Sequence, residues 1–170
     1  SEIQETPTPM DDRDYMEQAL ALAREAAQEG EVPVGCVIVQ GDEIVGRGRN
    51  RREHTKSALS HAEIEAIAQA NQRLGGWRLW QCTMYVTLEP CPMCAGAIIN
   101  ARIPRVVYGA SDRKFGACQS VCSLFQMGFN HHPVVEGGVM GEESAALMQT
   151  FFQNLRVELR TRPKWKKPEV

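Results

Sequence analysis

The sequence has no apolar run that approaches the roughly 20 residues needed to cross a bilayer. The first nine residues are polar, with two acidic side chains and two prolines, which is unlike a secretory signal. Internal repeats and low-complexity linkers are absent as well. We therefore expect a soluble, cytoplasmic protein of one domain with no membrane partner, since 170 residues leave little room for a second domain.

Net positive charge is also lacking, because the formal charge of the chain is −2. The charge is unevenly distributed. Residues 1–31 hold nine acidic and two basic side chains, whereas residues 47–56 hold five basic against one acidic, and residues 156–170 hold six basic against two acidic. The two basic segments are candidates for contact with a phosphate backbone. The alternative is a solvated surface and a frayed tail.

Apolar periodicity and capping residues predict four helices and five strands. Asp11 or Asp12 is expected to cap the first helix, and Ser60 the second, which ends at Gly75. Residues 47–59 are expected to form a loop. The helices are expected at 12–30, 61–75, 91–100 and 142–160, and the strands at 34–39, 44–46, 82–88, 105–109 and 134–139.

This order of elements predicts a three-layer α/β/α sandwich around a five-stranded mixed sheet. We place the single domain at residues 10–160. A disordered tail is expected before it at residues 1–9, and a basic, flexible tail after it at residues 161–170.

The six cysteines are informative through their spacing. A chain of this length and apolar content does not need a disulfide framework. Cys91 and Cys94, however, form a C-x-x-C directly after Pro90. This spacing is typical of a redox pair or of two metal ligands. On the predicted helix the two thiols share one face.

His61 and Glu63 lie at the start of another predicted helix, where side chains two apart can converge because they tilt toward the N-terminus. Two helix N-termini that meet at one point also favour thiolates. His61, Cys91 and Cys94 make three ligands, one fewer than in a closed structural zinc site. The sequence therefore predicts one catalytic Zn²⁺ per chain with a position left for water, and Glu63 as the general base.

Alternative roles for these residues stay open. The C-x-x-C could be a redox couple, and a single histidine is often a satisfied core residue. A second zinc site at Cys118, Cys122, His131 and His132 is a further alternative, although adjacent histidines rarely point at one ion. The cysteines expected to be small buried apolar groups in strands are Cys36 and Cys82.

H-x-E followed by P-C-x-x-C is the signature of the cytidine-deaminase-like zinc deaminases. From about residue 10 to 156 the chain resembles the bacterial tRNA-specific adenosine deaminases within that superfamily. The residues that carry the resemblance are Pro33-Val34-Gly35, Asn50, His61-Ala62-Glu63, the run from Thr87 to Ile98, Asp112-x-Lys114-x-Gly116-Ala117, Asn130-His131 and Phe151-Phe152.

The resemblance implies a cytidine-deaminase-like fold, a homodimer, and conversion of the wobble adenosine of a tRNA anticodon stem-loop to inosine. It also implies roles for further residues. Those expected to hold the purine are Asn50, the backbone of Ala62 and the carbonyls near Leu88 and Glu89; those expected to hold the flanking nucleotides are Asp112, Lys114, Asn130 and Phe152.

Two other functions fit part of the sequence. A free-base deaminase acting on guanine or cytosine would keep the same zinc site, but it would not need the basic segments. An RNA-binding module stapled by zinc would explain the basic segments and the cysteines. It would leave Glu63 and the three-ligand count unexplained.

Overall fold

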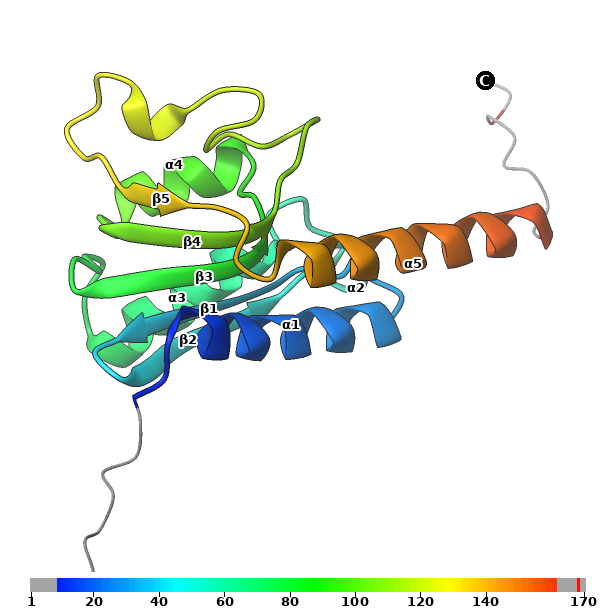
Figure 1. Cartoon of the computed structure of the whole chain (residues 1–170), viewed down its shortest axis with the longest axis horizontal. Coiled ribbons are helices and arrows are strands. Elements are labelled where there is room, and N and C mark those ends of the chain that lie inside the picture. The colour runs from blue at the N-terminus through cyan, green and yellow to red at the C-terminus, as the bar shows by residue number, and fades with distance from the viewer. Residues whose placement is uncertain (1–8, 162–167, 169–170) are drawn as a thin grey trace, which may run out of the picture.

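The computed structural model describes residues 9–161 and 168, which form a sheet between two layers of helices (Figure 1). The predicted three-layer sandwich around a five-stranded mixed sheet is confirmed. The tails predicted at 1–9 and 161–170 fall, apart from Pro9, Thr161 and Pro168, outside the described residues. The helices are α1 (Asp12–Gln28), α2 (Arg52–Thr55), α3 (Ala62–Leu74), α4 (Pro92–Asn100), the 3-10 helix η1 (Leu124–Gln126) and α5 (Gly141–Thr161).

The sheet has the strand order β2-β1-β3-β4-β5. Strand β1 pairs antiparallel with β2 and β3, whereas β3, β4 and β5 run parallel. Because β3 and β4 are parallel, their carboxyl ends lie at the same end of the sheet, where the segments that follow both strands begin. The strands are β1 (Gly35–Gln40), β2 (Glu43–Arg49), β3 (Cys82–Leu88), β4 (Arg105–Ala110) and β5 (Val134–Glu136).

Helices bury both faces of the sheet, because successive side chains of its strands point to opposite sides. In β1, Cys36 and Ile38 join the cluster under α3 and α4, while Val37 and Val39 join the cluster under α1. Burial on both faces explains why β1 is almost continuously apolar. None of the helices in the part of the chain that the structure describes is long and apolar enough to span a membrane.

Helix α3 lies very close to β2 because two glycines face it. A Cβ atom at Gly46 would overlap the carbonyl oxygen of Ala66, and one at Gly48 would overlap that of Ala62. Ala62 is the first residue of α3. The glycines of β2 therefore determine how close the start of α3 can come to the sheet.

Several predicted boundaries are corrected by hydrogen bonding. The residue at the N-cap position of α3 is His61, not Ser60, and its side chain makes no capping hydrogen bond. The predicted loop 47–59 contains the end of β2 and the one-turn helix α2. Strand β5 ends at Glu136, because the N–H of Gly138 turns back to donate to the carbonyl of Gly109.

Helix α5 covers the sheet with only its first turns and then extends beyond it (Figure 1). Ser144 is its one fully buried residue among those described. Further along the helix, Leu147, Phe151 and Leu155 are half-buried and line a groove beside α1. Leu159, one turn further, is exposed.

Because a methyl group at Gly48 has no space, we expect Gly48→Ala to cost about 1–3 kcal/mol of the free energy of unfolding. Thermal unfolding measures this. The matched control is Gly96→Ala in α4, where a Cβ meets nothing within 4 Å and helix propensity favours alanine. Equal thermal midpoints for Gly48→Ala and the wild type would contradict this account of the packing of α3.

Candidate active site

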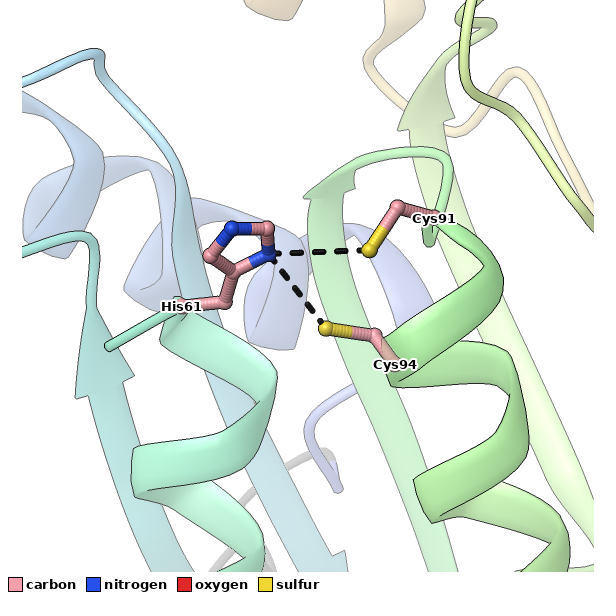
Figure 2. A group of neighbouring side chains, drawn as sticks. All are labelled: His61, Cys91 and Cys94. Carbon is pink, nitrogen blue, oxygen red and sulfur yellow. Dashed lines mark hydrogen bonds between the residues drawn. The ribbon is translucent and has the colours of Figure 1, made fainter. Parts of the chain in front are cut away.

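Three predicted ligands come together where α3 and α4 begin (Figure 2). The Nδ1 atom of His61 lies 3.6 Å from the Sγ atoms of both Cys91 and Cys94. His61 is the N-cap of α3 and Cys91 the N-cap of α4. Neither side chain caps its own helix through a hydrogen bond, so both are free to face the common centre.

This group fits a zinc ion. In a tetrahedral site, Zn–S bonds of about 2.3 Å and Zn–N bonds of about 2.0–2.1 Å place sulfur and nitrogen roughly 3.5 Å apart. The observed 3.6 Å from Nδ1 to each Sγ is close to that value. Among the described residues, His61, Cys91 and Cys94 form the only group of three or more such donors close enough to share an ion.

The charge state of the two thiols also favours a cation. Hydrogen bonds from Cys94 and His61 lower the pKa of Cys91 to about 4. The Cys91 thiolate, together with burial, raises the pKa of Cys94 far above its usual range. Without a cation the pair therefore holds one proton. A dication stabilises the second thiolate, as the positive ends of α3 and α4 do to a smaller extent.

Glu63 lies in the first turn of α3, next to the ligands, and is 4% exposed. Burial, followed by the negative charge of Cys91, raises the pKa of this carboxyl. A buried glutamate with a raised pKa takes up and releases a proton nearer neutral pH than an exposed one. The position of Glu63 thus suits proton transfer within the cavity.

The group opens into a cavity of about 860 Å³ between α2, α3, α4, α5 and the segment after β4. Of the predicted site residues, Cys94 is fully buried and Asn130 lies elsewhere. The others all line the cavity: His61, Glu63, Cys91, Asn50, Ala62, Leu88, Glu89, Asp112, Lys114 and Phe152.

Asn130 is exposed in the segment before β5. The ring of the adjacent His131 contacts the carbonyl oxygen of Ile103 at 2.7 Å, just before β4 begins. The cavity lies at the other end of β4, beside Ala110. Because β5 runs parallel to β4, the chain must return to the starting end of both strands. The structure therefore does not place Asn130 with the other predicted substrate residues, and a binding role for it stays a prediction.

Glu89 contributes more than the carbonyl expected from the sequence. Its carboxylate, 2% exposed, accepts backbone N–H bonds from Asp112, Cys118, Gln119 and Ser120 at 2.9–3.2 Å, and a bond from the Ser120 hydroxyl. These donors span the segment that carries Asp112, Lys114 and Phe115 into the cavity wall. The side chain of Glu89 thus holds this wall together.

The same carboxylate explains a glycine of the motif. A Cβ atom at Gly116 would overlap the Glu89 carboxylate and the carbonyl of Asp112. The Asp112 side chain itself accepts from the N–H groups of Lys114 and Phe115. Asp112 therefore shapes the turn as well as facing the cavity.

The basic segment 47–56 is less free than its composition suggests. Arg49 donates two hydrogen bonds to the carboxylate of Glu29, at 3.2 and 2.8 Å. Arg52 and Lys114 line the cavity, and among the described residues neither side chain pairs with a carboxylate. Arg52 is therefore the basic residue of this segment that the cavity exposes to a ligand, together with Lys114 from the segment after β4.

The alternative second zinc site is not formed. His132 contacts the carbonyl oxygen of Met127. Cys118 is buried, whereas Cys122 is exposed, and the two do not enter any group of metal donors among the described residues. Cys36 and Cys82 are buried in strands, as predicted.

Comparison with known proteins agrees with this geometry. A model of the MafB19-like deaminases matches residues 10–156. A tRNA-specific adenosine deaminase of Streptococcus pyogenes is 48% identical over 143 residues, which cover 84% of this chain and 90% of that protein. The chain belongs to the tRNA-specific adenosine deaminase family. The predicted resemblance is thereby confirmed.

Solved structures of this deaminase family and of more distant proteins share the fold. One from a study of A-to-I editing by tRNA:A34 deaminases superposes with a TM-score of 0.75 at 44% identity, covering 78% of this chain and 97% of that one. A guanine deaminase of Nitrosomonas europaea gives a TM-score of 0.66 at 20% identity, covering 88% and 86% of the two chains. At that identity the second comparison supports the fold alone.

Some cavity residues of this deaminase were not identified from the sequence. Phe115 and Met148 line the cavity, as do Arg113 and Gln149. The helical spacing of Ala145, Met148 and Phe152 could have indicated a shared face of α5. Nothing local to the sequence identifies Glu31, which contacts α2 from 22 and 23 residues away.

Glu89→Gln tests whether this carboxylate organises the wall at 112–120. Glutamine keeps the shape but replaces one acceptor oxygen with a donor that faces backbone N–H groups. We expect faster amide exchange at Asp112 and at 118–120, and a loss of about 1–3 kcal/mol of stability. Glu143→Gln is the control, because Glu143 is exposed and, within the described part of the chain, its ion pair is with Arg13, at 3.5 Å. Unchanged protection in Glu89→Gln would show that the wall is held by other contacts.

Proposed function

We propose that this protein hydrolyses the wobble adenosine of a tRNA anticodon to inosine and ammonia, with one Zn²⁺ held by His61, Cys91 and Cys94. One observation carries the proposal. A buried glutamate and a three-donor metal group share one cavity, in a chain 48% identical to a tRNA-specific adenosine deaminase. Three protein ligands are typical of catalytic zinc, because they leave a coordination position for water.

The proton transfers are assigned to Glu63. The zinc ion supplies Lewis acidity, which lowers the pKa of water at that position. The Glu63 carboxylate accepts a proton from the attacking water and delivers it to N1 of the purine as the new C6–O bond forms. It then carries the second proton of that water to the amino group, which leaves as ammonia when the C6–N bond breaks. One water is consumed, and Glu63 ends in its starting state.

The walls of the cavity are assigned to substrate binding. Asn50 and the backbone of Ala62 and Leu88 lie beside the metal group and suit contact with the purine. Lys114 and Phe152 lie further out, on the segment after β4 and on α5, and suit a phosphate and a stacked flanking base. A nucleotide in an anticodon loop is unpaired, so that its extrusion into the cavity costs less than flipping from a duplex.

A free-base deaminase is less well supported. It would need only the inner part of the cavity, and it leaves the unpaired cations Arg52 and Lys114 at the mouth without a role. Arg156 is a further cation that a free-base deaminase would not need, since it lies one helical turn beyond Phe152 on α5. An RNA-binding module without activity does not explain the buried carboxyl of Glu63.

The homodimer and the cytoplasmic location implied by the resemblance are part of this proposal. Exposed apolar side chains support an assembly, since large apolar groups left in water by one chain are often covered by a partner. Exposed examples are Leu59, Phe115, Val121, Met127 and Phe129, of which Phe115 lines the cavity.

We expect about one zinc per chain, and none in Cys91→Ala or Cys94→Ala, because two donors cannot hold the ion tightly. Elemental analysis of the purified variants measures this. Cys122→Ala is the control, because Cys122 is an exposed free thiol outside the donor group and its loss should not change zinc content. Full zinc in both ligand variants would place the ion elsewhere.

Inosine formation tests the function itself. The purified protein should produce inosine in bulk tRNA, measured after digestion to nucleosides. Glu63→Gln should keep its zinc and lose about 10²–10⁴-fold in rate, because the proton carrier is gone. Free adenosine, guanine and cytosine are the parallel substrates. Turnover of a free base without inosine in tRNA would overturn the proposal, and a zinc-loaded Glu63→Gln at wild-type rate would overturn the role of Glu63.

A further inference from the structure

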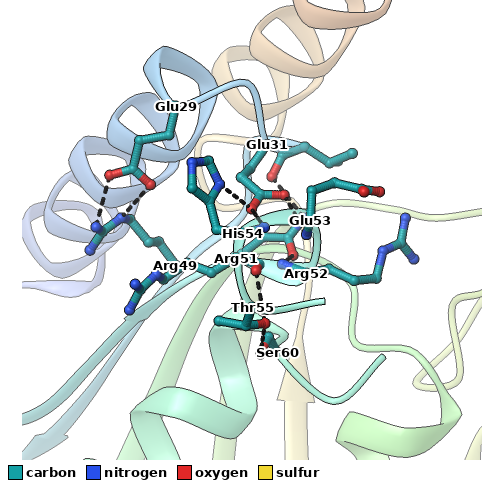
Figure 3. Close-up of polar contacts among 11 residues, drawn as sticks. Glu29, Glu31, Arg49, Arg51, Arg52, Glu53, His54, Thr55 and Ser60 are labelled. Carbon is teal, nitrogen blue, oxygen red and sulfur yellow. Dashed lines mark hydrogen bonds and ion pairs between the residues drawn. The ribbon is translucent and has the colours of Figure 1, made fainter. Parts of the chain in front are cut away.

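Glu31 is a buried carboxylate that the deamination chemistry does not use. It follows α1 and is 1% exposed. Its two oxygens accept the backbone N–H groups of Glu53 and His54, each at 3.0 Å, and one of them lies 2.8 Å from Nδ1 of the His54 ring (Figure 3). Every one of these partners belongs to the one-turn helix α2.

These contacts complete the start of α2. The residue at its N-cap position, Arg51, makes no capping bond with its side chain. Glu31 supplies the missing acceptor from a distant part of the chain, and its negative charge lies where helix N–H groups point. Burial alone would raise the pKa of Glu31, but the N–H and ring of His54 and the N–H of Glu53 lower it overall, so the carboxylate is ionised at neutral pH.

Helix α2 is also tied to the active site. The N–H of Arg52 donates to Oδ1 of Asn50, and Nδ2 of Asn50 donates to the carbonyl of Val32, next to Glu31. At the same end of α2, the N–H of Arg51 donates to the carbonyl of Ser60, the residue before His61. The position of α2 therefore decides where the Arg52 side chain stands.

Arg52 is the side chain that α2 contributes to the cavity. Its guanidinium pairs with no carboxylate within the described ranges, 9–161 and 168, whereas that of Arg49 is held by Glu29. An unpaired guanidinium at the mouth of a cavity suits a phosphate.

We propose that Glu31 is a positioning residue for RNA binding: through α2 it holds Arg52 at the cavity mouth, where Arg52 contacts a phosphate of the anticodon loop. This inference rests on the proposed function. It assigns Glu31 no contact with the substrate and no part in proton transfer.

The proposal and simple electrostatics predict opposite changes in RNA affinity when Glu31 is removed. Glu31 is an anion near a surface that binds a polyanion, so that its removal should strengthen RNA binding if charge alone matters. If Glu31 positions Arg52, its removal should weaken binding. Glu29→Gln is the matched control. Glu29 is an acid two residues earlier. Its carboxylate accepts two hydrogen bonds from Arg49 and, among the described residues, none from α2, and its removal leaves Arg49 with the 4.0 Å ion pair to Glu25.

The experiment measures kcat, KM and salt dependence on an anticodon stem-loop RNA with zinc-loaded full-length variants. Glu31→Ala should raise KM at least about fivefold and keep kcat within about twofold. It should also flatten the slope of log affinity against log salt by up to about one, and Arg52→Ala should flatten that slope by the same amount. Glu29→Gln should leave KM unchanged or lower it. His54→Ala, which removes only the half-exposed ring partner, should raise KM in the same direction by a smaller factor.

A double-mutant cycle decides whether Glu31 acts through Arg52. In the Arg52→Ala background, Glu31→Ala should add less than about twofold to KM, because the positioned group is already gone. Additive effects, or tighter binding by Glu31→Ala, would overturn the inference. If Glu31→Ala loses zinc or unfolds, His54→Ala alone decides, and a KM equal to the wild type would overturn it. Failure of the wild type to form inosine in RNA would instead overturn the proposed function.

Discussion

The convergence of two helix N-termini is the constraint on which the rest of this structure depends. Helices α3 and α4 begin at the same edge of the sheet, and each presents a metal donor at its N-cap position. The positive ends of the two helices stabilise a thiolate at Cys91. Glu63 is the second residue of α3 and lies in its first turn. The glycines of β2 allow α3 to lie close to the sheet, and this close packing fixes where α3 begins. The packing of two helices on one sheet therefore brings the donor group of His61, Cys91 and Cys94 next to the buried carboxyl of Glu63.

The two walls of the cavity are built on a common principle. Each holds backbone N–H groups that converge on one buried carboxylate, Glu31 for the one-turn helix α2 and Glu89 for the irregular segment after β4. Irregular backbone cannot satisfy its own polar groups as a helix or strand does, so that a buried acceptor is needed wherever such a segment must hold one shape. The two carboxylates thus fix the backbone of the walls, whereas the starts of α3 and α4 fix the positions of His61, Cys91 and Cys94.

The donor group and much of the cavity lining are thus carried by different kinds of segment. The metal donors and Glu63 lie on the first turns of helices fixed by the core, whereas Arg52, Lys114 and Phe115 lie on segments attached to it. A site on rigid elements keeps reacting groups in place, while loops can change the substrate that reaches them.

Local pattern in the sequence was enough for the fold class, for β3 at 82–88, and for the grouping of His61, Cys91 and Cys94, because helix caps and a C-x-x-C are short-range signals. It was not enough for the cap of α3, the helix α2 or the position of Asn130, and it gave no indication of Glu31. These depend on contacts between residues far apart in the chain: the parallel pairing of β4 with β5 carries Asn130 away from the cavity, and a carboxylate 22 residues away completes α2. The sequence by itself determined which chemistry is present, and the tertiary structure decided which side chains surround it, because hydrogen bonds between distant segments form only once the sheet has brought those segments together.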